Sequence, residues 1–91
     1  MAQVAFGRAA LAKMAQLDEA HPLAEVLIRD GAAVLGRHPL IGPSVSGKKD
    51  RRRLVISAGK TGYIALYRYY QARNIVLVLA VRHQREAGYA E

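Results

Sequence analysis

The longest unbroken apolar run in the chain is the feature that most restricts its fold. Residues 75–81 contain only aliphatic side chains, several of them β-branched. The run is too short to cross a bilayer as a helix, for which about 20 residues are needed. A short apolar run rich in β-branched residues predicts instead a strand that is buried on both faces of a sheet.

Two further candidate strands, residues 53–57 and 63–70, precede this run. The turn between them contains Gly59, and Asn74 closes the turn that leads into residues 75–81. Glycine supplies the positive φ that tight hairpin loops require. The second half of the chain is therefore expected to form a three-stranded antiparallel meander.

The first half of the chain begins with a strand candidate at residues 3–6, which Gly7 ends. Helical spacing of apolar residues then predicts a helix from residue 8 to about residue 18, with the stripe Ala10, Leu11, Met14 and Leu17. Pro22 suits the first turn of a second helix that ends near Gly36. The apolar stripe expected for it is Leu23, Val26, Leu27, Val34 and Leu35.

Residues 38–43 contain two prolines and predict a turn, and residues 44–50 predict a polar loop. Neither helix buries enough surface to be stable alone, so the two are expected to form a hairpin against one sheet face. The expected fold is therefore α+β: a short N-terminal strand and a two-helix hairpin packed on an antiparallel sheet that the meander completes. The order is β-α-α-β-β-β, in a single domain over residues 1–91.

The positive charge is confined to one half of the chain. Of a net charge of +7, residues 1–47 contribute nothing, because their four basic and four acidic residues balance. A one-sided positive field indicates an acidic partner, either a nucleic acid or a carboxylate-rich polypeptide. Solubility alone is the other explanation. The basic residues expected to form this surface are Lys48, Lys49, Arg51, Arg52, Arg53, Lys60, Arg82 and Arg85.

Several classes of protein are disfavoured by composition and motif. With no cysteine, the chain has neither a disulfide framework nor a thiolate zinc site. We expect no metal and no cofactor. We expect a cytoplasmic protein without a signal peptide or membrane span. Residues 42–48 match the spacing of a phosphate-binding P-loop, but Lys49 stands where a magnesium-binding Ser or Thr is needed. A helix also precedes this segment, whereas a P-loop follows a strand.

Four segments in order give the chain a resemblance to a known family. These are residues 38–42 (HPLIG), 54–57 (LVIS), 62–68 (GYIALYR) and 82–89 (RHQREAGY). Together with the order of strands and helices, they resemble the RelE/ParE family of toxins from type II toxin–antitoxin pairs. The resemblance implies a bacterial toxin that a cognate antitoxin neutralises, through an acidic C-terminal segment, in a toxin–antitoxin hetero-oligomer.

The resemblance implies one of two activities. ParE-like members bind DNA gyrase and trap its complex with cleaved DNA, whereas RelE-like members cut messenger RNA on the ribosome without a metal. The segment 62–68, together with Arg82 and His83 at the end of the last predicted strand, is more similar to the ParE-like members, which favours gyrase inhibition. A non-toxic basic RNA-binding module, or a degenerate toxin, is a further alternative.

RNA cleavage would need a base, an acid and cations around one phosphate. The residues that could supply these in a RelE-like enzyme are Arg68, Arg82, His83, Arg85, Glu86 and Tyr89. Strand alternation places Arg68 on the face of Ile64 and Leu66. It places Arg82 with Val78 and Ala80, and His83 with Leu79 and Val81. A purely structural role is the alternative for His83, as sheet packing is for Tyr63, Tyr67 and Tyr69.

Overall fold

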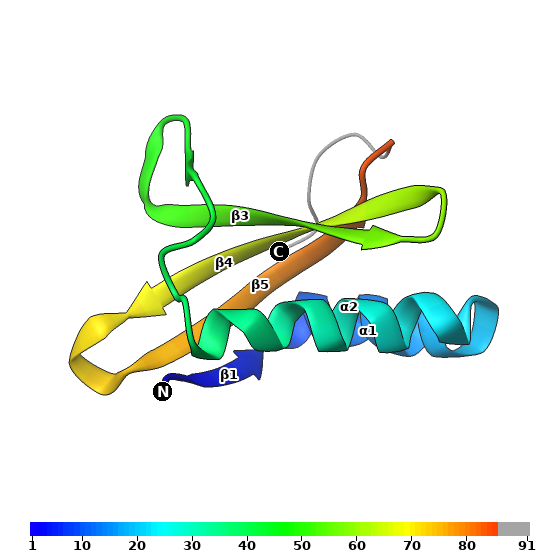
Figure 1. Cartoon of the computed structure of the whole chain (residues 1–91), viewed down its shortest axis with the longest axis horizontal. Helices are drawn as coiled ribbons and strands as arrows, with labels where there is room; N and C mark the ends of the chain where they lie inside the picture. The colour runs from blue at the N-terminus through cyan, green and yellow to red at the C-terminus, as the bar shows by residue number, and fades with distance from the viewer. Residues whose placement is uncertain (86–91) are drawn as a thin grey trace.

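The computed structural model describes residues 1–85, except for the side chain of Lys49. Its elements follow the order β1 (Gln3–Phe6), α1 (Arg8–Ala20), α2 (Pro22–Ala32), the 3-10 turn η1 (Ala33–Gly36), β2 (Ser44–Val45), β3 (Lys48–Ala58), β4 (Thr61–Tyr70), the 3-10 turn η2 (Gln71–Arg73) and β5 (Ile75–His83) (Figure 1). This order confirms the α+β class and adds the short strand β2. Within residues 1–85, no helix is both long and apolar enough to span a membrane.

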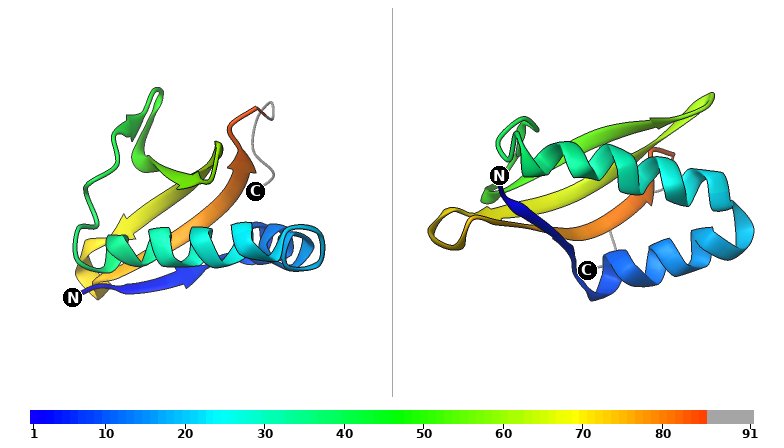
Figure 2. Two further views of the ribbon diagram at one scale, coloured as in Figure 1. Left: turned by 45° about the vertical axis from the view of Figure 1, so that its right-hand side comes forward. Right: turned by 60° about the horizontal axis from the view of Figure 1, so that its bottom comes forward.

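The five strands form one sheet in the order β1-β5-β4-β3-β2. The strands β3, β4 and β5 pair antiparallel as the expected meander, and β1 joins β5 in parallel. Both helices lie on the same side of this sheet (Figure 2). Val76 and Val78 on that side are 0% exposed, whereas Ile75 and Leu77 are only half-buried. Burial of β5 on both faces is therefore wrong at Ile75 and Leu77, because the helices cover one face only, but it holds near the end of the strand, where Ala80 and Val81 on opposite faces are 1% and 6% exposed.

The apolar stripes expected for the two helices are both partly wrong. In α1, Ala10, Met14 and Leu17 are buried as expected, but Leu11 is 57% exposed. In α2 and η1, Leu35 is buried as expected, but the other side chains that reach the core are Ile28 and Ala32, which the expected stripe did not include. Leu23 and Val26 are 70% and 47% exposed.

Close contact between α2 and the sheet explains the orientation of α2. A Cβ atom on Gly31 would lie 2.6 Å from Cγ2 of Ile56 in β3. The helix can therefore approach β3 closely only with Gly31 facing the sheet. This orientation points Ile28 and Ala32 to the core and leaves Leu23 at the surface.

The turns combine confirmed and corrected predictions. Gly59 has φ +67°, as expected for the first turn of the meander, and Asn74, which closes the second turn, is also left-handed at φ +53°. The polar loop expected at residues 44–50 is wrong: Ser44 and Val45 form β2, and β3 already begins at Lys48. Gly47, with φ +78°, lies in the turn of this additional hairpin, which projects from the body of the molecule (Figure 1).

A buried tyrosine holds the segment that links the helices to this hairpin. Tyr67 is 0% exposed, and its hydroxyl accepts a hydrogen bond of 2.9 Å from the backbone N–H of Gly42. Arg52 donates from Nη1 to the backbone oxygens of Leu40 (3.2 Å) and Gly42 (2.8 Å). Arg52, which the sequence placed on the partner-binding surface, therefore has a structural contact at this position.

Replacing Tyr67 with phenylalanine should lower the free energy of unfolding by about 1–2 kcal/mol, because the Gly42 N–H loses its acceptor in the interior. The variant should also differ from the wild type at alkaline pH. Burial raises the pKa of Tyr67, outweighing the opposing effects of the Gly42 hydrogen bond and the Arg52 charge. The unfolded chain loses this proton at about pH 10, before the folded protein does.

This contribution to stability is therefore complete below about pH 10 and declines as the pH rises through the pKa of the folded state. Urea unfolding of the wild type and Y67F between neutral and alkaline pH measures both effects. Y70F, which changes a half-buried tyrosine, is the control. An identical alkaline decline in wild type and Y67F would contradict the prediction.

Candidate functional site

A bulge in the sheet decides which side chains share a face near the end of β5. Tyr67 pairs with Val78, but the preceding residue Leu66 pairs with Ala80. Leu79 is thus the extra residue on the β5 side of the ladder. An extra residue reverses the face on which every later side chain lies, relative to strict alternation.

The bulge corrects the expected positions of Arg82 and His83. Arg82 pairs with Ile64 and shares its face with Ala80 but not with Val78. His83 lies on the opposite, helix-covered face, as does Val78. Arg82 shares its face with Ala80 and His83 shares its face with Val81, as expected; the prediction that is wrong is that Val78 shares the face of Arg82.

Three arginines share the sheet face that points away from the helices, which we call the open face. Arg68 lies there with Ile64 and Leu66, as expected; Arg82 pairs with Ile64 and Arg53 pairs with Leu66. Arg68, Arg53 and Arg82 come from the adjacent strands β4, β3 and β5. The meander therefore brings together cations that are far apart in the sequence.

Local contacts orient Arg68 on the open face. Its Nε lies 3.4 Å from Oδ2 of Asp50, and its guanidinium lies 4.5 Å from the centre of the Tyr70 ring. The Arg68 side chain remains 41% exposed. It is thus held in one place by a carboxylate and an aromatic ring while still accessible to a ligand.

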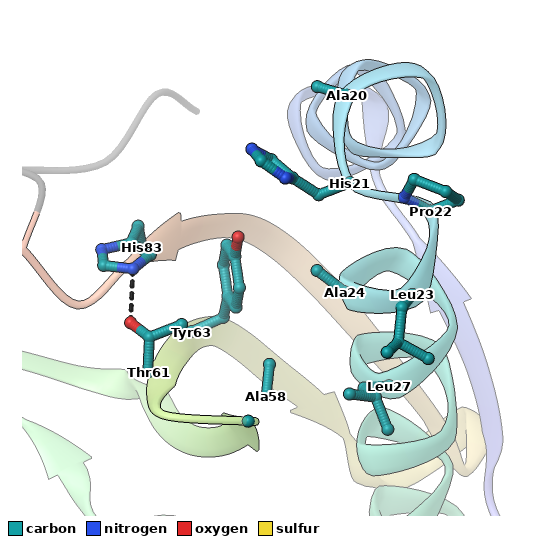
Figure 3. A pocket seen from close by; sticks show the side chains of 11 residues that line it. Ala20, His21, Pro22, Leu23, Ala24, Leu27, Ala58, Thr61, Tyr63 and His83 are labelled. Carbon is teal, nitrogen blue, oxygen red and sulfur yellow. Dashed lines mark hydrogen bonds between the residues drawn. The ribbon is translucent and has the colours of Figure 1, made fainter.

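His83 is held on both sides of its ring. Nδ1 accepts a hydrogen bond of 3.1 Å from the backbone N–H of Arg85, and Nε2 is hydrogen-bonded to Oγ1 of Thr61 (Figure 3). Its ring meets that of Tyr63 edge to face, with centroids 5.2 Å apart. Since Nδ1 accepts, this bonding pattern assigns the proton to Nε2, which donates to Thr61.

Removing the Thr61 hydroxyl should test this arrangement. T61V is expected to lower the free energy of unfolding by about 1 kcal/mol, because the His83 Nε2–H loses its partner in a half-buried position. T61S keeps the hydroxyl and should remain within about 0.5 kcal/mol of the wild type. Urea unfolding measures both, and equal stability of T61V and T61S would show that the hydrogen bond contributes nothing.

His83 also lines a pocket among the described residues. This pocket, about 540 Å³ in volume, lies between the turn joining α1 to α2 and the turn joining β3 to β4 (Figure 3). Most of its lining is apolar, with Leu23, Leu27 and Ala24 on the side of α2 and Ala58 and Tyr63 on the sheet. A neighbouring recess of about 290 Å³ shares Tyr63 and His83 and adds Lys13.

The pocket contains residues that the sequence did not single out. His21 and Pro22 mark the break between the two helices, and Gly59 marks the hairpin turn, so both ends of the pocket were visible as separate signals. Nothing in the sequence placed these two turns side by side. Leu23 was assigned to the core, and its 70% exposure in the pocket wall is known only from the fold.

The basic residues that the sequence suggested for binding and cleavage do not form one cluster but lie in different strands and turns. Lys60 is exposed at the β3–β4 turn, Arg85 is exposed just after β5, and Lys48 is exposed at the start of β3. Arg51 is half-buried in β3. The side chain of Lys49 and the residues Glu86, Ala87, Gly88 and Tyr89 lie outside the described part of the chain.

The cleavage set is divided between the two faces of the sheet. Arg68 and Arg82 stand on the open face, whereas His83 stands on the helix-covered face. Arg85 contacts His83 through its backbone N–H. Within residues 1–85, the candidate cations and the candidate base thus do not converge on one point.

Comparison with known proteins identifies the family. No curated protein matches the sequence. Residues 4–88 match the family described as the ParE toxin of type II toxin-antitoxin system, parDE. The match runs from β1 to beyond the end of β5, and the α+β fold agrees with the resemblance that the sequence suggested. The chain therefore belongs to the ParE toxins of type II toxin–antitoxin systems.

Proposed function

We propose that this toxin inhibits DNA gyrase and that the acidic C-terminal segment of its cognate antitoxin neutralises it. The match to ParE toxins over residues 4–88 is the observation that carries the choice of target. ParE-like toxins act by occupying gyrase, so they need a binding surface and no set of catalytic groups.

The position of His83 supports this choice over RNA cleavage. A general base must reach the attacking hydroxyl while cations contact the same phosphate. Both ring nitrogens of His83 already have hydrogen-bond partners, on the face opposite to Arg68 and Arg82. A phosphate bound by those arginines would be separated from this imidazole by the sheet.

A gyrase supercoiling assay with the purified full-length chain tests the target. We expect loss of supercoiling as toxin is added, with linear DNA released when the reaction is stopped with detergent and protease. Addition of antitoxin should restore supercoiling. A parallel reaction with ribosomes and messenger RNA tests the RelE-like alternative.

Two results would contradict the gyrase proposal. Normal supercoiling with excess toxin, together with messenger RNA cut on the ribosome, would establish the RelE-like activity. Normal results in both assays, and unimpaired growth of bacteria that express the chain without antitoxin, would favour a non-toxic RNA-binding module or a degenerate toxin.

We further propose that the antitoxin segment docks in the pocket between the helix turn and the sheet. The pocket is open and apolar, and its wall includes the highly exposed Leu23. Lys13 borders the adjoining recess, and Lys60 lies in the turn beside Gly59. An amphipathic segment with carboxylates at its edges fits a groove of this kind.

Placing a charge on the pocket wall should weaken antitoxin binding. L23D is expected to raise the dissociation constant about 30-fold, because a buried leucine contact worth about 2 kcal/mol is replaced by a charge that must be desolvated. V26D is the matched control, since Val26 is exposed on the same helix but does not line the pocket. Isothermal titration calorimetry with the antitoxin peptide measures both. Equal loss in both variants would place the antitoxin elsewhere on α2.

A further inference from the structure

We propose that the open face is a second binding surface, which contacts the phosphate backbone of duplex DNA. It lies on the opposite side of the sheet from the apolar pocket. The toxin would therefore present different chemistry on its two sides, an apolar groove for a polypeptide and an arginine surface for a polyanion.

The arginines of the open face are spaced for repeated contacts with a chain of phosphates. Arg53 pairs with Leu66 on the neighbouring strand, and Arg68 lies two residues further along that strand. This diagonal offset corresponds to about 8 Å between the Cα atoms of Arg53 and Arg68. Arg82 lies two strands from Arg53, at about 12 Å by the same spacing. Arginine offers a planar set of donors that matches two phosphate oxygens at once.

The open face is accessible on its β3 side and at Arg68, whereas its centre is closed: Ile64, Leu66 and Ala80 on this face are 8%, 2% and 1% exposed, and Arg82 is half-buried. Within residues 1–85, the open face carries no helix (Figure 2). Arg53 is exposed, and its neighbour Val55, on the same face, is 60% exposed. The Tyr70 ring orients the Arg68 guanidinium before any ligand binds, which reduces the entropy lost on binding.

The aromatic residues indicate a duplex and not a single strand. Proteins that bind single strands stack bases on several exposed rings. Here Tyr63 and Tyr67 are 6% and 0% exposed beneath the helices, and Tyr69 packs against the same core. The one tyrosine of β4 on the open face, Tyr70, already has the Arg68 guanidinium over its ring. Within residues 1–85, the open face therefore offers cations without a free stacking ring, which favours contact with the outside of a duplex.

Binding of a fluorescein-labelled duplex DNA to the purified full-length chain, followed by anisotropy, tests the proposal. Measurements from about 50 to 200 mM salt give the slope of log K against log salt, to which each phosphate contact contributes about 0.9. R53Q should weaken binding about eightfold at 0.1 M salt and reduce the slope by about 0.9.

Two further variants change the charge of the open face without removing an arginine. D50N removes the carboxylate that competes for Arg68 and should tighten binding severalfold. V55E places a carboxylate next to Arg53 on the same face of β3, in the cross-strand row that contains Ile64 and Arg82, and should weaken binding at least as much as R53Q. V55Q, its neutral counterpart, should bind like the wild type and shows that the exposed position tolerates a polar side chain.

An arginine outside the open face provides the control for net charge. Arg8 is exposed at the first position of α1, and R8Q removes the same unit of charge as R53Q. The proposal fails if R8Q reduces the slope as much as R53Q, or if R53Q and V55E both bind like the wild type. Displacement of DNA by polyglutamate at equal charge concentration would mark the face as a site for an acidic polypeptide. Tighter binding to a labelled single strand would overturn the preference for a duplex.

This inference deepens the gyrase proposal, in which toxin and cleaved DNA would belong to one complex, but the binding test contains no gyrase. The toxin could bind DNA and leave supercoiling unaffected, which would contradict only the choice of target. It could equally inhibit gyrase and fail to bind DNA alone, which would contradict only the role of the open face.

Discussion

Replacing Gly42 with alanine is expected to lower the free energy of unfolding by about 3–4 kcal/mol, which corresponds to a drop of about 15–25 °C in Tm for a domain of this size. A Cβ atom at this position would lie 2.2 Å from the backbone oxygen of Arg53 and 2.9 Å from the hydroxyl of Tyr67. Neither neighbour can move away cheaply. Arg53 is paired with Leu66 in the sheet, and Tyr67 is fully buried.

The G42A substitution would also disrupt a small network of hydrogen bonds. The N–H of Gly42 donates to Tyr67, its oxygen accepts from Arg52, and the neighbouring Pro43 oxygen accepts from the N–H of Arg53. Moving the segment to make room for a methyl group would lengthen these hydrogen bonds together. The cost of G42A therefore exceeds that of a single steric contact.

Gly47 provides the control for G42A. It has φ +78° and nothing within 4 Å of a built Cβ, so G47A measures backbone strain without a clash and should cost about 1 kcal/mol. Thermal and urea unfolding of the two variants separate the effects. If G42A lost no more stability than G47A, the segment from Leu40 to Pro43 would not be held against β3 as described.

Replacing Gly31 with alanine is expected to lower the free energy of unfolding by about 2–3 kcal/mol. Helix propensity alone predicts the opposite, a gain of up to about 1 kcal/mol for alanine in place of glycine inside a helix. The steric clash is expected to outweigh this gain, because the new methyl group would lie 2.6 Å from Cγ2 and 3.1 Å from Cγ1 of Ile56. Ile56 is 5% exposed and packed beneath α2, so it has little space to turn into.

A double-mutant cycle with I56A tests the cause of this loss. I56A alone should lose about 2–5 kcal/mol through the cavity it leaves. Combined with G31A, the added methyl group occupies part of that cavity, so the double variant should be more stable than the sum of the two losses predicts. Urea unfolding of all four proteins gives the coupling energy. Strict additivity, or a stabilised G31A, would show that α2 does not approach β3 closely at this residue.

Much of the architecture could be predicted because it depends on local signals. The left-handed residues Gly59 and Asn74 mark the two turns of the meander. The apolar run at residues 75–81 marks β5, and Pro22 marks the start of α2. Each of these features depends on the φ preference or the hydropathy of a few neighbouring residues, which is independent of the rest of the fold.

The helix stripes show where local signals become insufficient. Leu23 and Val26 fit an apolar stripe of α2 as well as Ile28 does, so periodicity offered more than one face for burial. The contact between Gly31 and Ile56 selects the orientation, and it joins residues from different halves of the chain. The same selection leaves Leu23 in the wall of the apolar pocket.

The sequence by itself determined the order of the elements, the concentration of positive charge in the second half and the membership of the ParE family. Only the tertiary structure decided which residues stand together at the end of β5. The bulge at Leu79 turns His83 toward the helices and Thr61, and places Arg82 beside Ile64 on the open face. The sequence could not show the bulge, because residues 77–81 are apolar at every position and a shift of one residue leaves the hydropathy pattern unchanged.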